Sequence, residues 1–322
     1  MPNLNLIVSV YIYCKNKDNM SIEDDAKKIV EAKEKKTIGR VDVSRKIEEP
    51  AKQLGYKAVD INVLPSRGWF YPNETKIAIA PAKIAEIRHW STIEESDPIS
   101  VDASLNFIME RCVKINMPGS ISTFKDLKEI DRLYLLFAVR ELTFQNGQNA
   151  LTAEYYDNDK LEKVELTKEM ISYFDMPADF EEYYNNERKC FVFVNPDDAG
   201  ETLDIYFPSI GISEEVEKWK NNRLRKRRTV EKDFLSSIQF LTKTWRDVTD
   251  KNLDDLAMKS NNWSLWKISM LSYITSLLID IIDPTMTIKK SNGEEDVMPL
   301  NFQGGLKAVF IIPNPLGRPR RD

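Results

Sequence analysis

The spacing of apolar residues changes between two periods along the 322-residue chain. A recurrence every three or four positions predicts three helices, within residues 84–90, 99–115 and 123–144. A short alternating run predicts a strand at Lys76–Ala80. Pairs of short apolar runs around turn residues predict two β-hairpins, at 151–156 with 163–166 and at 190–194 with 203–207. The pattern therefore indicates an α+β fold with a helical core and short β-hairpins.

The C-terminal third has a longer helical pattern. Ser213 is suited to cap a long helix, in which Phe234, Ile238, Leu241, Trp245 and Val248 recur at alternating spacings of four and three. The apolar run Leu265–Ile282 predicts the partner helix, ended by Asp283-Pro284. Together they predict a helical hairpin, followed by a last strand at Leu306–Ile312.

These patterns divide the chain into three parts. Residues 1–57 are expected to be a charged, partly ordered extension, in which Ser21 begins a helix that runs to about Lys36. Residues 58–210 form the expected α+β domain, and residues 211–322 hold the helical hairpin, the last strand and a basic tail. Lys267 and Asp280 interrupt the apolar run at 265–282, so we expect a buried core helix there and no membrane span.

Composition argues against several classes of function. The net charge of −5 does not suit a protein that coats nucleic acid or an anionic membrane as a whole. Three separated cysteines and one histidine, His89, provide neither a disulfide framework nor a usual zinc set. Cys112 and Cys190 have no histidine close in sequence, and His89 has no recognisable serine or cysteine partner. No glycine-rich phosphate loop occurs. We therefore expect no catalytic residues, no metal and no cofactor, and we predict that the protein is not an enzyme.

The most distinctive segment is Leu64–Pro72, in which Pro65 and Gly68 precede three consecutive aromatic residues and Pro72 follows them. Proline and glycine favour a turn. The segment reads as a shaped docking or folding element, and we predict that it contacts a partner through Pro65, Gly68, Trp69, Phe70 and Tyr71.

A second candidate contact surface is the basic run Arg223, Arg225, Lys226, Arg227 and Arg228. Such a run can neutralise phosphates, form a solvated helix face balanced by nearby acids, or attract an acidic protein partner. No aromatic residues are interleaved with it to stack on bases, which weakens the nucleic-acid interpretation.

Two charged residues, Asp131 and Arg140, fall on the helix predicted at 123–144, which is apolar on most sides. A buried charge costs several kcal/mol unless it is paired. At nine residues apart the two lie about two and a half turns from each other, so we expect each to find a different partner.

The segment Leu64–Tyr71, the run Ile77–Pro81 and Glu86 resemble the start of the T4-type bacteriophage baseplate hub subunit family. In that family a Leu-Pro-Ser-x-Gly-x-x-Tyr turn leads into a short strand and an acid-bearing helix. The resemblance extends over about residues 60–210. Cys112 corresponds to the end of a helix, Leu127 and Asp131 to the start of the next, and Arg140 to its end.

The resemblance implies a structural or assembly protein of the baseplate hub of a contractile tail, which acts through protein–protein contacts. Its expected partners are other tail or baseplate proteins. Its expected location is the virion, or the host cytoplasm during assembly. The sequence also leaves open that the protein forms a homo-oligomer. An alternative function is that of a viral protein that associates with nucleic acid through the basic helix at 218–232, which contains the basic run.

Overall fold

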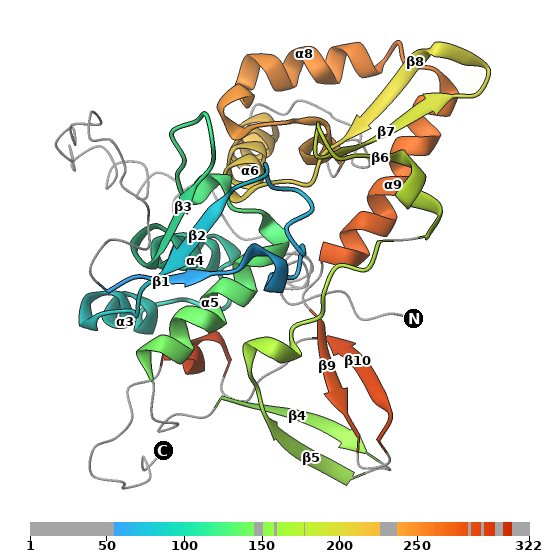
Figure 1. Cartoon of the computed structure of the whole chain (residues 1–322). Coiled ribbons are helices and arrows are strands. Elements are labelled where there is room, and N and C mark those ends of the chain that lie inside the picture. The colour runs from blue at the N-terminus through green and yellow to red at the C-terminus, as the bar shows by residue number, and fades with distance from the viewer. Residues whose placement is uncertain are drawn as a thin grey trace, which may run out of the picture.

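The computed structural model describes residues 55–144, 151–157, 160–176, 178–225, 237–282, 285–290, 293–299 and 305–310. Helices and short antiparallel strands alternate along the chain, which confirms the α+β class (Figure 1). In this part of the chain, no helix is long and apolar enough to cross a membrane. The predicted helix at 21–36, the charged extension up to residue 54, and Phe234 lie outside the described residues.

The first sheet consists of β1 (Lys57–Val59), β2 (Lys76–Ile79) and β3 (Val113–Asn116), with β2 in the middle. Both pairings are antiparallel, and Ile77 lies opposite Val59 and Ile115. Three helices pack around this sheet: α3 (Ile84–Ser91), α4 (Pro98–Cys112) and α5 (Glu129–Thr143). The prediction of a helix at 99–115 was wrong at its C-terminal end. Helix α4 stops at Cys112, and residues 113–116 form a strand that pairs with β2.

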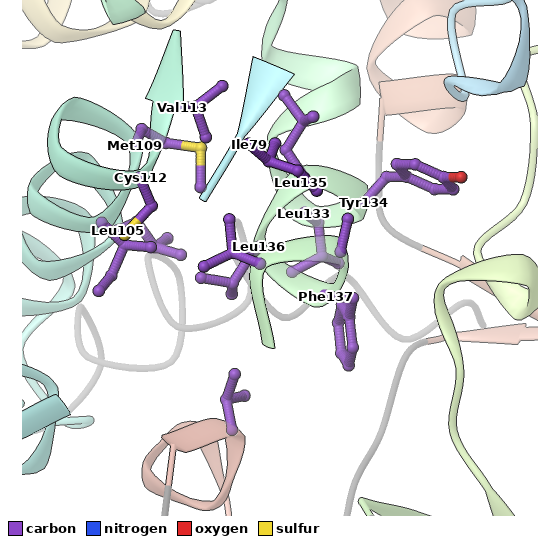
Figure 2. Packing of buried hydrophobic residues seen from close by; sticks show 14 of the residues in the cluster. Ile79, Leu105, Met109, Cys112, Val113, Leu133, Tyr134, Leu135, Leu136 and Phe137 are labelled. Atoms are coloured by element: carbon purple, nitrogen blue, oxygen red, sulfur yellow. The ribbon is translucent and has the colours of Figure 1, made fainter. Parts of the chain in front are cut away.

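Helix α5 is the centre of the first core, since every residue from Ile130 to Arg140 is buried. Figure 2 shows Leu105 and Cys112 of α4 meeting Leu136 of α5 in this core. The same cluster contains Phe310 from the C-terminal part of the chain. The first core therefore joins residues on both sides of the boundary predicted at 210.

A second core lies beneath the sheet of β6 (Tyr184–Asn185), β7 (Cys190–Asn195) and β8 (Asp198–Ile205). Helix α9 (Leu265–Ile282) packs against β8 through Leu271, Ile274 and Leu278. The bounds of α9 agree with the sequence pattern. The β7–β8 hairpin was also predicted, but its second strand begins at Asp198, five residues before the predicted start at 203. A smaller third cluster joins α6 (Ile210–Arg225) to α8 (Asp250–Ser260).

Two hairpins form the lower part of the molecule in Figure 1, β4 (Thr152–Asp157) with β5 (Lys160–Glu165) and β9 (Thr285–Lys289) with β10 (Glu295–Pro299). The first was predicted and the second was not. Ala153 of the first hairpin and Met286 and Ile288 of the second belong to the first core. The segment after β5 also contacts β9, where the amide N–H of Ser172 donates to the carbonyl of Thr285 at 3.0 Å.

The first of the two long helices predicted for the C-terminal hairpin is wrong in its described part from residue 237, whereas the second is confirmed as α9. Helix α6 is followed, from residue 237, by two 3₁₀ turns, Ile238–Leu241 and Trp245–Asp247, where the apolar seam predicts a continuous helix. The predicted strand at 306–312 is also wrong in its described part, because Leu306–Phe310 forms a 3₁₀ helix. That helix docks on α3 and α5, where the indole N–H of Trp90 donates to the carbonyl of Leu306 at 2.8 Å.

Candidate functional site

The segment Leu64–Tyr71 folds into consecutive tight turns. Backbone hydrogen bonds run from Arg67 N–H to the Leu64 carbonyl at 2.8 Å and from Trp69 N–H to the Ser66 carbonyl at 3.0 Å. Gly68 has a φ of +74°, and a Cβ there would lie 3.2 Å from the side chain of Ile61. The positive φ favours glycine at this position, and the space beside Ile61 is tight for any larger residue.

The aromatic residues of this turn point into the interior. Phe70 stacks on Phe207 at a ring distance of 4.0 Å in the second core, whereas Tyr71 belongs to the first core. Trp69 is half-buried and meets Tyr184 edge-on at 4.9 Å. The turn therefore joins two cores of the same chain, which favours the folding interpretation of this segment over docking.

Little of the predicted contact surface is open in this turn. Pro65, Phe70 and Tyr71 are buried, and Gly68 and Trp69 are partly exposed. Arg67 is exposed, and its guanidinium lies 5.6 Å from the ring centre of Tyr173. A partner that contacts this corner would therefore meet Arg67, Trp69 and Tyr173.

Asp131 lies at the centre of the corner, with no exposed surface. Its Oδ1 accepts the Ser66 amide N–H and its Oδ2 accepts the Tyr71 hydroxyl, both at 2.8 Å. The Tyr71 hydroxyl in turn accepts the Lys128 amide N–H at 2.9 Å. Burial raises the pKa of Asp131 to about 6, against the opposing effect of these hydrogen bonds and of the Lys128 charge.

Lys128 extends the network to a third segment. Its amine donates to the Phe207 carbonyl at 2.9 Å, and burial lowers the pKa of this amine to about 8. Next to it, the Glu129 amide N–H donates to the Pro208 carbonyl at 3.1 Å. The start of α5, the aromatic turn and the chain entering α6 are thus held together at one buried polar point.

A second buried network holds α4 against α5. One guanidinium nitrogen of Arg132 donates to Asp102 and to Glu129, each at 2.7 Å, and the other donates to Asn106 at 2.7 Å. Arg140 donates instead through Nε to the Val309 carbonyl at 2.9 Å. Asp131 and Arg140 therefore find separate partners, which confirms the expectation from their spacing.

A third network accounts for the 3₁₀ turn at Trp245–Asp247, where the sequence pattern predicts a continuous helix. Buried Asp126 accepts the Trp245 indole N–H at 2.9 Å and two guanidinium nitrogens of Arg246 at 2.7 and 3.0 Å. The Trp245 ring packs onto Gly211, where a Cβ would lie 2.7 Å from it. These contacts hold the two residues in a 3₁₀ turn, and no local pattern in the sequence indicates them.

In the described part of the basic run, Arg223 already interacts with other residues of the chain. Arg223 forms an ion pair with Asp254, and its guanidinium lies 4.9 Å from the ring centre of Trp219. Arg225 is exposed, whereas Lys226, Arg227 and Arg228 lie outside the described residues. On α6 itself, Lys218 forms an ion pair with Glu214 at 2.8 Å. This arrangement matches the solvated helix face more closely than a row of free cations.

An open cleft of about 560 Å³ lies between the β7–β8 turn and the start of α9. Two carboxylates line it, Asp198 and Glu201. Glu201 accepts the Ser264 hydroxyl at 2.7 Å and the Asn195 amide at 2.8 Å. The Lys267 amine donates to the Thr202 carbonyl at 2.7 Å. Glu201, Ser264 and Lys267 are thus engaged in hydrogen bonds within the chain.

The described residues contain no cluster of histidine, cysteine, aspartate or glutamate that could hold a metal ion. His89 packs against the Phe107 ring at 4.0 Å. Cys112 is buried, and burial raises the pKa of its thiol to about 12, so the reactive thiolate is rare at neutral pH. Comparison of the chain with protein-family models, with curated proteins and with solved structures found no match.

Proposed function

We propose that this chain is a structural or assembly protein of the baseplate hub of a contractile phage tail, and that it acts by protein–protein contacts. The observation that carries the proposal is the role of the turn at 64–71. The residues that resemble the hub family are those that join the two cores, through Phe70 on one side and Tyr71 on the other. A resemblance at the residues that hold two cores together supports a shared architecture.

The described surface also offers contacts of the kind that assembly requires. Tyr156 and Leu161 are cross-strand neighbours on the β4–β5 hairpin and are 71% and 51% exposed. The β4–β5 hairpin that carries this pair lies at the edge of the molecule (Figure 1). Exposed apolar residues that lie together are typical of interaction sites. The half-buried Trp69 beside exposed Arg67 provides a second such position.

The test begins with purified tails. Contractile tails from cells that produce the chain are separated by density gradient, and the chain is sought by mass spectrometry in finished tails and in assembly intermediates. We expect it in at least one of these fractions. Its absence from all of them, with normal baseplates after deletion of the gene, would contradict the proposal.

A surface variant then separates contact from folding. The double change Tyr156→Ala with Leu161→Ala should leave the circular dichroism spectrum unchanged and reduce the yield of baseplates seen by electron microscopy. Ile99→Ala is the control, because Ile99 is 65% exposed, between Leu161 and Tyr156, but lies on α4. Equal yields for the two variants would argue against this hairpin as the contact.

A further inference from the structure

The outer face of α9 carries no charged residue over three turns. Leu265, Ile268 and Tyr273 on this face are 81%, 44% and 58% exposed. The other residues of the face are serines, and all are exposed: Ser269, Ser272 and Ser276. At about 100° per residue the six side chains lie within an arc of about 140°. In a chain with 30% charged residues, an exposed helix face without one calls for an explanation.

The rest of α9 is firmly anchored in the molecule. Leu271, Ile274 and Leu278 are buried in the second core on the opposite side of the helix. The only charge between residues 265 and 276 is Lys267, whose amine is turned to the Thr202 carbonyl of β8. The outer face is therefore held at a fixed position while its apolar side chains stay in contact with solvent.

We propose that this face pairs with the same face of a second copy, with the two α9 helices antiparallel. A two-fold axis near residue 270 places Leu265 opposite Ser276 of the second copy and Ile268 opposite Ser272 of the second copy. It also places Tyr273 opposite Ser269 of the second copy. Each large side chain then meets a serine, so that the two identical surfaces interlock, as an isologous interface requires.

The chemistry of the face suits this occupant. No charge has to be desolvated when two such faces meet, and opposed serines let the helices approach closely. The Ser276 hydroxyl already donates to the Tyr273 carbonyl at 2.7 Å, so burying it does not leave its donor group unpaired. A charged partner would find no counter-charge on this face, whereas a second copy matches it in both size and polarity.

The size of the face sets the strength of the pairing. Residues 265–276 span about 18 Å of helix at about 1.5 Å per residue. One helix face of this length is smaller than the roughly 800 Å² per partner of a standard interface. The dimer is therefore expected to be weak and to form as the protein concentration rises. This inference does not depend on the proposed function, because the face and its pairing would exist in any setting.

Disulfide trapping tests the geometry directly. In a Cys14→Ser background, Ser272→Cys lies close to the two-fold axis and should give a disulfide-linked dimer under mild oxidation. Ser91→Cys is the matched control, because Ser91 is an exposed helical serine on α3. We expect at least about tenfold faster cross-linking at residue 272, since pairing brings only that position together. Equal rates at the two positions would overturn the proposal.

Sedimentation velocity over a concentration series provides an independent test on the full chain. The unaltered protein should shift from monomer towards dimer, and Ser272→Glu should remain monomeric with an unchanged circular dichroism spectrum. Placing two unpaired carboxylates at the interface should weaken pairing by at least about tenfold. A monomer at every concentration, or a dimer that Ser272→Glu leaves intact, would overturn the proposal. If a different protein covers the outer face of α9 instead, the purified chain will remain a monomer at every concentration.

Discussion

The hydroxyl of Tyr71 donates to Asp131 at 2.8 Å, and it links the aromatic turn to a carboxylate 60 residues later that has no exposed surface. The same hydroxyl accepts the Lys128 amide N–H at 2.9 Å. One oxygen atom thus serves a buried acceptor and a partly buried donor at once. Burial raises the pKa of Tyr71 well above its usual value, so the hydroxyl keeps its proton at any physiological pH.

Tyr71→Phe should therefore destabilise the protein although it removes only one atom. Asp131 loses one of its hydrogen-bond donors and the Lys128 amide loses its acceptor, and each buried unpaired group costs about 1–3 kcal/mol. Urea unfolding followed by fluorescence should show a lower midpoint. Tyr156→Phe is the control, because Tyr156 is 71% exposed, and it should change the midpoint little. Equal effects of the two variants would contradict the buried network.

The buried carboxylate also predicts a pH dependence with a defined sign. The pKa of Asp131 is about 6 in the folded chain against an ordinary value of 3.8. Between about pH 4 and pH 6 the folded protein retains a proton that the unfolded chain releases, so the contribution of Asp131 to stability falls as pH rises. About two pKa units correspond to roughly 3 kcal/mol. Lys128, which faces Asp131, stays charged over this range because its pKa is about 8.

Asp131→Asn isolates this effect. The asparagine does not titrate, so the unfolding free energy of the unaltered protein relative to the variant should fall by roughly 3 kcal/mol between pH 4 and pH 7. The comparison cancels the contribution of other carboxylates, such as Glu214 and Glu215, whose pKa values are lowered. Parallel stability curves for the two proteins would show that Asp131 does not titrate in this range.

Gly211→Ala offers a test of the Asp126 network in which two known effects oppose each other. Gly211 is the second residue of α6, so alanine in its place should stabilise the helix by less than the value of about 1 kcal/mol that is typical of a helix interior. A Cβ at this position, however, would lie 2.7 Å from the Trp245 ring and 2.8 Å from Cβ of Lys125. Such overpacking costs about 1–3 kcal/mol, so we expect net destabilisation.

The control is Gly200→Ala, whose Cβ would meet only the flexible Asp198 side chain, at 3.2 Å. Thermal unfolding of both variants distinguishes the two outcomes. If Gly211→Ala raised the melting temperature, the close packing of Trp245 on α6 would be disproved.

The elements that the sequence pattern predicted well are those in which local and tertiary preferences agree. Leu265–Ile282 is apolar and ends at Asp283-Pro284, and its bounds match the structure. Val113–Ile115 could continue α4 by spacing, but both end residues are β-branched and the segment pairs with β2. The local sequence is compatible with both helix and strand, and pairing with β2 determines the strand conformation.

The candidate site was less accessible to prediction because its contacts join distant residues. The aromatic residues at 69–71 were identified from sequence, but not the direction in which Phe70 and Tyr71 point. Trp245 fitted a helical seam, yet its indole is held by Asp126, 119 residues earlier. Neither periodicity nor composition records such a pairing, so the turn could be located from sequence whereas its partners could not.

The alternative function in nucleic-acid binding yields the last prediction, which concerns the basic run. Arg223 is paired with Asp254, so Arg225 and the three residues that follow are the cations to test. We change Arg225, Lys226, Arg227 and Arg228 to glutamine and titrate both proteins with labelled single- and double-stranded DNA at several salt concentrations. Neutralising four phosphate contacts would change the slope of log affinity against log salt by about 3 to 4. We expect weak binding and equal slopes, because the chain has a net charge of −5 and the acids of α6 balance its lysines. A steep slope that the variant loses would instead favour nucleic acid as the partner of this helix.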